Sequence, residues 1–181
     1  MSLLGFSFVG TTAAVRMVTT AKNPAVPDGL WGYRVDAGHH LLGGATSEGG
    51  NIFRWVTDTL NLTGLDVEGH LSRAQPDGHG LTVLPLLAGE RSPGWASHAT
   101  GTITGLRLST TPLDLMQAAL EGVALRLGII ADQLGPLVEA GAAVYAGGGA
   151  VTASPAWTQI ITNALNRPFH LVAETKATAR G

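Results

Sequence analysis

The feature that most constrains the fold of this chain is a long helical pattern over Pro112–Leu134, where apolar residues recur every three or four positions. Thr111 fits the N-cap, Pro112 the first helical position, and Asp114 the positive end of the helix dipole. Gly135-Pro136 ends the helix. One apolar stripe therefore runs along the whole helix, and its members are Met116, Leu120, Val123, Leu127, Ile130 and Leu134.

Short apolar runs elsewhere predict strands. The first two are joined by a small-residue turn, which is typical of a β-hairpin. Strands come first as a meander and then alternate with helices, so we expect an α/β domain with a mixed sheet. Residues 21–29 and the polar stretch 64–80 are predicted as loops. We expect helices also at 51–60 and 155–166, and strands at 5–9, 13–19, 33–42, 81–87, 101–108, 142–146 and 169–173.

Composition narrows the class of protein. The length of 181 residues suits one compact domain, and 45% hydrophobic with 13% charged residues indicates a globular chain. The net charge is −2 without a basic stripe, which argues against a nucleic-acid partner. Cysteine is absent, so disulfides and thiol nucleophiles are excluded and a reducing cytoplasm is compatible. No apolar run is long enough to cross a bilayer, and the N-terminus does not resemble a signal peptide.

Two small-residue turns follow predicted strands, where backbone N–H groups could approach phosphate oxygens without obstruction by a Cβ. The first is Gly10-Thr11-Thr12, and the second is Gly147-Gly148-Gly149. Ser154 and Pro155 after the second turn predict a helix start, whose free N–H groups and dipole could bind an anion. A plain hairpin turn and a plain strand-to-helix connection are the alternatives.

Neither turn matches the better-known phosphate motifs. A Walker motif needs Gly-Lys, which occurs nowhere in the chain. A dinucleotide fingerprint starting at Gly147 would need glycine where Thr152 stands. A hydrolase of α/β fold is a weaker alternative, because the chain lacks a Gly-x-Ser-x-Gly nucleophile elbow.

The ordered set of motifs resembles the C-terminal, nucleotide-binding domain of FGGY carbohydrate kinases, over residues 9–181. The resemblance implies the actin-like ATPase, ribonuclease H-like α/β fold, with a mixed sheet and flanking helices. Each motif is modest, but their order is specific to the family. The matching segments are Gly10-Thr11-Thr12, Leu42-Gly43-Gly44-Ala45 with Gly50 and Trp55, Gly89-Glu90-Arg91-Ser92-Pro93-Gly94-Trp95, Gly101-Thr102-Ile103-Thr104-Gly105-Leu106 with Ala118, Leu120, Glu121 and Gly122, Gly148-Gly149-Ala150 with Ser154-Pro155, Trp157, Gln159 and Arg167-Pro168, and Glu174 with Ala179-Arg180-Gly181.

This resemblance implies transfer of the ATP γ-phosphoryl to a hydroxyl of a sugar or sugar acid, with Mg²⁺ bridging the phosphates. The motifs taken together are similar to those of gluconate kinase-like or xylulose kinase-like members. Thr11 and Thr12 would touch the β- and γ-phosphates, beside Gly10. Gly148 and Gly149 would meet the α-phosphate and ribose. Ser154 would lie on the nucleoside side, and Gly105 near the nucleotide.

The family's catalytic base is an Asp in a Gly-Asp motif before the phosphate hairpin, and the chain contains no Gly-Asp dipeptide. We therefore expect residues 1–181 to be a single C-terminal domain, truncated before its last helices and separated from the N-terminal domain that holds the sugar and the base. On this hypothesis the chain alone has negligible kinase activity. Its uncovered docking face would favour self-association, such as a homodimer.

Other readings stay open. A non-catalytic nucleotide-binding or assembly module of the same fold is the main alternative. His39-His40 is a weak metal pair, because neighbours on a strand point to opposite faces. Glu90 and Arg91 could form an ion pair that braces their loop, and Glu121 a hydrogen-bonded helix position. Trp157 is the one tryptophan that we would place near adenine.

Overall fold

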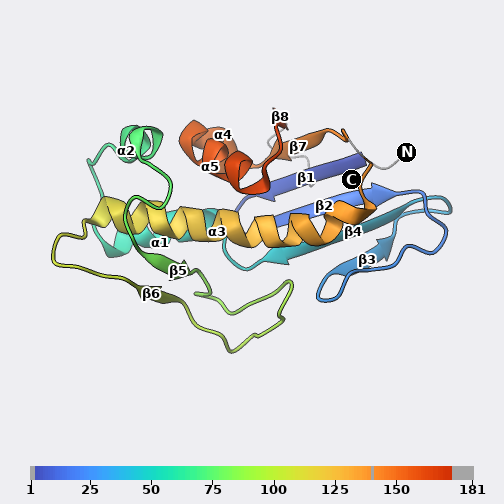
Figure 1. Ribbon diagram of the computed structural model, residues 1–181, viewed down its shortest axis with the longest axis horizontal. Coiled ribbons are helices and arrows are strands. Elements are labelled where there is room, and N and C mark those ends of the chain that lie inside the picture. The colour runs from blue at the N-terminus through green and yellow to red at the C-terminus, as the bar shows by residue number, and fades with distance from the viewer. Residues whose placement is uncertain (1–2, 140, 173–181) are drawn as a thin grey trace.

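The computed structural model describes residues 3–139 and 141–172 as one sheet covered by helices, with a small second sheet beside it (Figure 1). The main sheet has six strands in the order β3-β4-β2-β1-β7-β8. Their bounds are Leu3–Val9 for β1, Ala13–Thr19 for β2, Trp31–Arg34 for β3, His40–Thr46 for β4, Val144–Gly147 for β7 and Phe169–Leu171 for β8.

The pairing in this sheet is mixed, as expected. Strands β3, β4, β2 and β1 pair antiparallel with one another, whereas β1 pairs in parallel with β7, and β7 in parallel with β8. The two-stranded sheet pairs β5, Thr82–Leu84, with β6, Thr102–Thr104. The β1–β2 hairpin is confirmed, with Val9 opposite Ala13 at its closed end.

The helices lie mainly against the main sheet and each other. The long α3, Pro112–Leu134, crosses β2 and β4 and also packs against α5, Pro155–Leu165 (Figure 1). The remaining helices are α1, Gly50–Thr59, α2, Val67–Arg73, and α4, Gly149–Ala153, with a 3-10 turn at Gly135–Leu137.

The predicted stripe of α3 forms the centre of the core. All six of its members are completely buried, together with Met17 of β2 and Trp157 of α5. The helix starts with a capping box, because Thr111 accepts from the N–H of Asp114 while the Asp114 carboxylate accepts from the N–H of Thr111. The bounds expected for this helix are therefore confirmed.

Two expected elements are wrong, and the expected strands 81–87 and 101–108 are each only three residues long in the structure. Residues 33–42 form two strands, because Asp36 accepts from the N–H groups of Gly38 and His39 at 2.7 and 2.9 Å and so turns the chain between β3 and β4. The stretch 64–80 contains the helix α2, which begins where the Asp66 carboxylate accepts from the N–H of Gly69. The motif residues Glu174 and 179–181, and the last position of the expected strand 169–173, lie outside the described residues.

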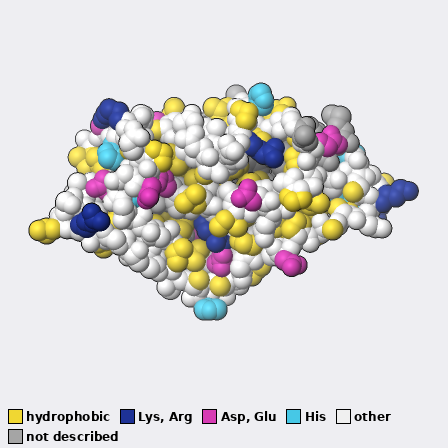
Figure 2. Space-filling model, viewed as in Figure 1, with side chains coloured by type: hydrophobic (Ala, Val, Ile, Leu, Met, Phe, Trp, Pro, Cys, Tyr) yellow, Lys and Arg dark blue, Asp and Glu magenta, His cyan; other side chains and the backbone are white. Residues whose placement is uncertain are grey.

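Charged side chains are spread singly over the face shown in Figure 2, without a basic stripe. Within residues 3–139 and 141–172 no helix is long and apolar enough to cross a membrane.

Candidate functional site

The hairpin turn Gly10-Thr11-Thr12 is held by the start of α1. The N–H of Gly50 donates to the carbonyl of Gly10, and the N–H of Asn51 donates to the carbonyl of Thr11 at 3.2 Å. A Cβ at Gly49 would lie 2.6 Å from the carbonyl carbon of Thr12, so only glycine lets α1 approach this closely. The turn thus directs carbonyls at α1, while Thr11 and Thr12 stay exposed.

The glycine turn after β7 lies beside this hairpin, because β1 and β7 are parallel neighbours with Phe8 opposite Gly147. Gly148 has φ +110° and ψ 152°, a conformation essentially restricted to glycine. Gly149 begins α4, and a Cβ built there meets no atom within 4 Å. The structure therefore brings the two small-residue turns side by side.

Two hollows open on either side of these turns, and Gly10, Thr11 and Gly149 line both of them. The larger hollow, about 770 Å³, extends toward α1, α2 and α5 and is lined also by Gly50, Phe53, Arg54, Leu65, Asp66, Val67, Glu68, Ala150, Ala153, Ser154 and Trp157. The smaller hollow, about 470 Å³, extends over β2, β3 and β4 and is lined also by Thr12, Ala13, Ala14, Arg16, Trp31, Tyr33, Leu41, Ala45, Arg91 and Gly148. Both volumes suit a small-molecule ligand.

The start of α5 is not an open anion site, contrary to the prediction. The carboxylate of Glu68 on α2 accepts from the Ser154 hydroxyl at 2.6 Å and from the N–H of Ala156 at 2.7 Å. Ser154 in turn accepts from the N–H of Trp157 at 3.1 Å. An internal carboxylate thus occupies the helix N-terminus that we expected a phosphate to use. Ser154 lines the larger hollow with its hydroxyl already engaged.

Gly105 lies away from both hollows. It follows β6 with φ +86°, and a Cβ there would lie 2.5 Å from the carbonyl oxygen of Gly80. The close contact of two loops explains why glycine stands at this position. The described residues that line the two hollows do not include Gly105, so the structure does not bring it to the other predicted site residues.

Glu90 and Arg91 have different neighbours, so the ion pair expected between them does not form. Glu90 pairs with Arg126 of α3, which also donates to the carbonyl of Ser92 at 3.1 Å. Arg91 lines the smaller hollow together with Arg16 of β2. The pKa of Arg16 is lowered, first by burial and then by the positive charge of Arg91.

The other residues singled out from the sequence have structural environments. Trp157 lines the larger hollow but is 1% exposed. Glu121 accepts from the N–H of Asp77, from His79 and from Gln117, so it ties a loop to α3. His39 contacts Asp36 at 2.9 Å in the β3–β4 turn. In the part of the chain that the structure describes, no group of three or more His, Cys, Asp or Glu side chains could hold a metal ion.

Sequence reasoning missed Glu68, Arg16 and the pair Gly49-Gly50 as parts of the site. A signal existed for the glycines, since two adjacent glycines directly before a helix suggest a close backbone approach. Neither Glu68 nor Arg16 gave such a signal. Ser154, the partner of Glu68, is 86 residues away in sequence, and the residues that line the hollow with Arg16 come from separate loops and strands.

Comparison with known proteins gives one consistent result. The profile of the FGGY family of carbohydrate kinases, C-terminal domain, matches residues 5–181. A gluconokinase from Bacillus licheniformis is 28% identical over 167 residues, covering 86% of this chain and 33% of the relative.

Solved structures agree with this result. A ligand-bound xylulose kinase from Lactobacillus acidophilus superposes with a TM-score of 0.82 at 29% identity, over 97% of this chain and 36% of that one. A gluconate kinase from the same organism gives a TM-score of 0.81 at 29% identity, over 97% and 35% of the two chains. The chain therefore spans about a third of the length of the relatives that it matches.

Proposed function

Because the chain belongs to the FGGY family of carbohydrate kinases, as its C-terminal domain, we propose that it is the ATP-binding part of an enzyme that phosphorylates a sugar or sugar acid. The transferred group would be the γ-phosphoryl of ATP, and the acceptor a hydroxyl. The observation that supports this most directly is the meeting of two hollows at Gly10, Thr11 and Gly149. A nucleotide in one hollow and an acceptor in the other would face each other across this junction.

The larger hollow suits the nucleoside. Its walls offer apolar side chains such as Phe53 and Leu65, with Arg54 at an exposed position. The phosphates would then lie over the junction, where Thr11, Thr12, Gly148 and Gly149 would have the roles that the family resemblance implies. Ser154 contributes indirectly, by holding Glu68 and hence the wall of the hollow.

This chain's part in the chemistry is positioning and stabilisation of the phosphates. Mg²⁺ bound to the phosphates would neutralise their charge. The proton of the acceptor hydroxyl needs a carboxylate within hydrogen-bond reach, and we assign that base to the domain that precedes this one in longer relatives. On this proposal the 181-residue chain has negligible kinase activity by itself, and the complete enzyme works in the cytoplasm, where ATP is supplied.

Calorimetric titration with Mg-ADP tests the proposal. We expect the parent chain to bind and a Gly149→Val variant to lose binding, because the new side chain projects into the open junction without meeting other atoms. Gly38→Val is the matched control, since Gly38 lies in the β3–β4 turn and its Cβ would meet only Asp36, at 3.8 Å. A folded parent that does not bind Mg-ADP, or equal binding by Gly149→Val, would contradict the proposed site.

A further inference from the structure

An apolar groove lies between α1, α3 and the small sheet of β5 and β6. It measures about 230 Å³, and no charged residue stands among the described residues that line it. Trp55 is 43% and Ile103 37% exposed, so the groove is open to solvent. An apolar cavity of about 150 Å³ can already hold benzene, so this groove has room for an aliphatic side chain. Its walls include Ile52, Trp55 and Leu60 of α1, Val83 and Ile103 of the small sheet, and Leu115 of α3.

The groove is separate from the candidate nucleotide site. It shares no lining residue with either hollow at the junction. Phe53 and Arg54 of α1 line the larger hollow, whereas Ile52, Trp55 and Val56 of the same helix line the groove. The helix α1 thus stands between the two, and a nucleotide at the junction leaves the groove uncovered.

The loop between β6 and α3 projects from one end of the molecule and carries an apolar residue into solvent (Figure 1). This residue, Leu108, is completely exposed. It lies in a tight turn, in which the N–H of Thr110 donates to the carbonyl of Arg107 at 3.0 Å and the N–H of Arg107 donates to the Thr110 hydroxyl at 2.9 Å. Such turn positions usually hold Gly, Pro, Asn, Asp or Ser. Because the turn fixes its backbone, this leucine can enter an apolar groove of a partner at a small cost in entropy.

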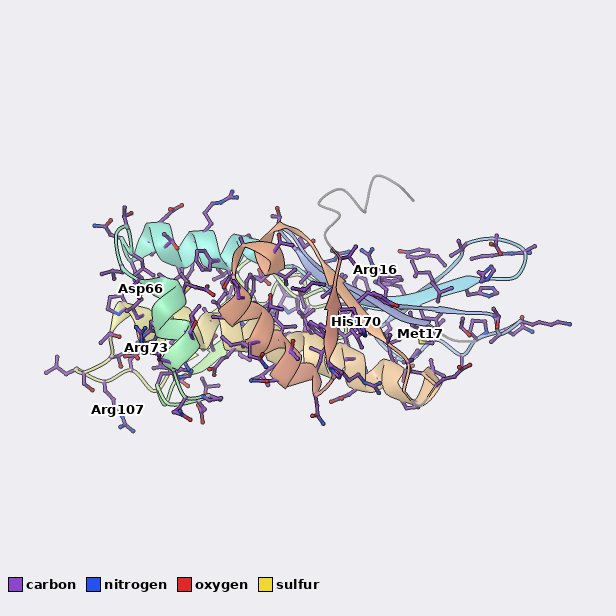
Figure 3. All side chains as sticks on the ribbon, turned by 90° about the horizontal axis from the view of Figure 1, so that it is seen from above. Arg16, Met17, Asp66, Arg73, Arg107 and His170 are labelled. Carbon is purple, nitrogen blue, oxygen red and sulfur yellow. The ribbon has the colours of Figure 1, made fainter. Side chains whose placement is uncertain are left out.

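The charge beside this leucine is opposite in sign to the charge beside the groove. Arg107 precedes Leu108 and is exposed, and Figure 3 labels it on the projecting loop. Asp58 is exposed on α1, three residues after Trp55, and residues three apart lie on the same side of a helix. The loop and the surroundings of the groove therefore complement each other in charge as well as in polarity.

From these contacts we propose that the loop and the groove bind a second copy of the chain. Leu108 of each copy enters the groove of the other, and Arg107 of each copy lies beside Asp58 of the other. A two-fold axis lets both contacts form at once, since one chain carries both the leucine and the groove. This inference does not depend on the proposed function, because the residues that line the junction take no part in the contact.

Sedimentation of the 181-residue chain over a range of concentrations tests this inference. We expect the parent to form dimers and Leu108→Asp to raise the dimer dissociation constant about a hundredfold or more, because two apolar contacts are lost per dimer. The side chain of Leu108 is completely exposed, so this variant keeps its fold, which circular dichroism checks. Leu125→Asp makes the same change at an exposed position of α3 outside the groove and should leave the dissociation constant unchanged.

Charge reversal tests the pairing of Arg107 with Asp58. Arg107→Asp and Asp58→Arg should each raise the dissociation constant about tenfold, because like charges then meet twice in each dimer. The double variant should return to within about threefold of the parent, since the two charges are exchanged rather than removed.

Three outcomes would overturn the inference. A parent that stays monomeric up to about 1 mM would leave the groove to a different partner. A dimer that Leu108→Asp does not weaken, or that Leu125→Asp weakens equally, would show that the copies associate through another surface. A double variant that dimerises no better than either single charge reversal would contradict the proposed arrangement of the two copies.

Discussion

The two faces of strands β2 and β4 differ in what their side chains do. On one face Ala13, Val15 and Met17 are at most 2% exposed and face the stripe of α3. On the other face Arg16, with Gly43 opposite, lines the smaller hollow. Arg16 and Met17 are neighbours in the chain, and Figure 3 labels both where they leave opposite sides of β2. One strand thus places alternate residues in the core and others at the wall of the hollow.

The largest expected effect comes from changing these two neighbours separately. Met17→Ala should lower the free energy of unfolding by about 2–5 kcal/mol, because it leaves a cavity at a completely buried position. Arg16→Gln should cost about 1 kcal/mol or less, because Arg16 lies outside the packed core. Urea unfolding of both variants would measure this. A similar loss of stability in both would break the distinction between the two faces.

Glu68 tests whether a wall of the larger hollow also stabilises the fold. Glu68→Gln should lower the free energy of unfolding by about 1–3 kcal/mol, because the carboxylate that binds Ser154 and the N–H of Ala156 is lost. Asp58→Asn, at an exposed position of α1, is the control and should change little. Equal unfolding curves for the two variants would show that Glu68 acts only as a lining residue.

Glu48 is a buried carboxyl group, and it should make the free energy of unfolding depend on pH. Burial raises the pKa of Glu48 above its usual 4.5, although the N–H of Ala88 and the charge of Arg126 act in the opposite direction. The folded state therefore binds more protons than the unfolded state above about pH 4.5, so stability falls as the pH rises from there through the raised pKa. Glu48→Gln should remove this decrease, as measured by unfolding at several pH values. An unchanged pH profile would contradict this.

The smallest effect is expected far from both faces, at the start of α3. Thr111→Ala should lower the free energy of unfolding by about 1 kcal/mol, because the N–H of Asp114 loses its cap. The pKa of Asp114 is lowered, mainly because its carboxylate accepts from the N–H of Thr111. The stabilisation from the carboxylate side of the capping box is therefore present above the usual pKa of 3.8 and is lost as the pH falls through the lowered value. Thermal unfolding at neutral pH, with the change Ser109→Ala at an exposed position as a comparison, gives the size of the effect. A larger loss for Ser109→Ala would contradict the cap.

Local patterns were sufficient for the elements that carry their own signals. The helix Pro112–Leu134, its N-cap, and the strand Ala13–Thr19 follow from spacing and capping chemistry, which act within a few residues. The strand pair within residues 33–42 and the helix within 64–80 were missed. Each depends on one Asp side chain that binds nearby N–H groups, a signal too short to change the pattern around it.

By its own residues, the sequence determined the α/β class, the core stripe of α3 and the two small-residue turns, because these depend on periodicity and on the conformational freedom of glycine. Only the tertiary structure decided which charged residues meet at the candidate site. It placed Glu68 on the helix N-terminus predicted to bind an anion, paired Glu90 with Arg126, and left Arg91 to join Arg16. Such choices depend on which charges come within a few ångströms of each other once the chain folds, and no local pattern encodes that distance.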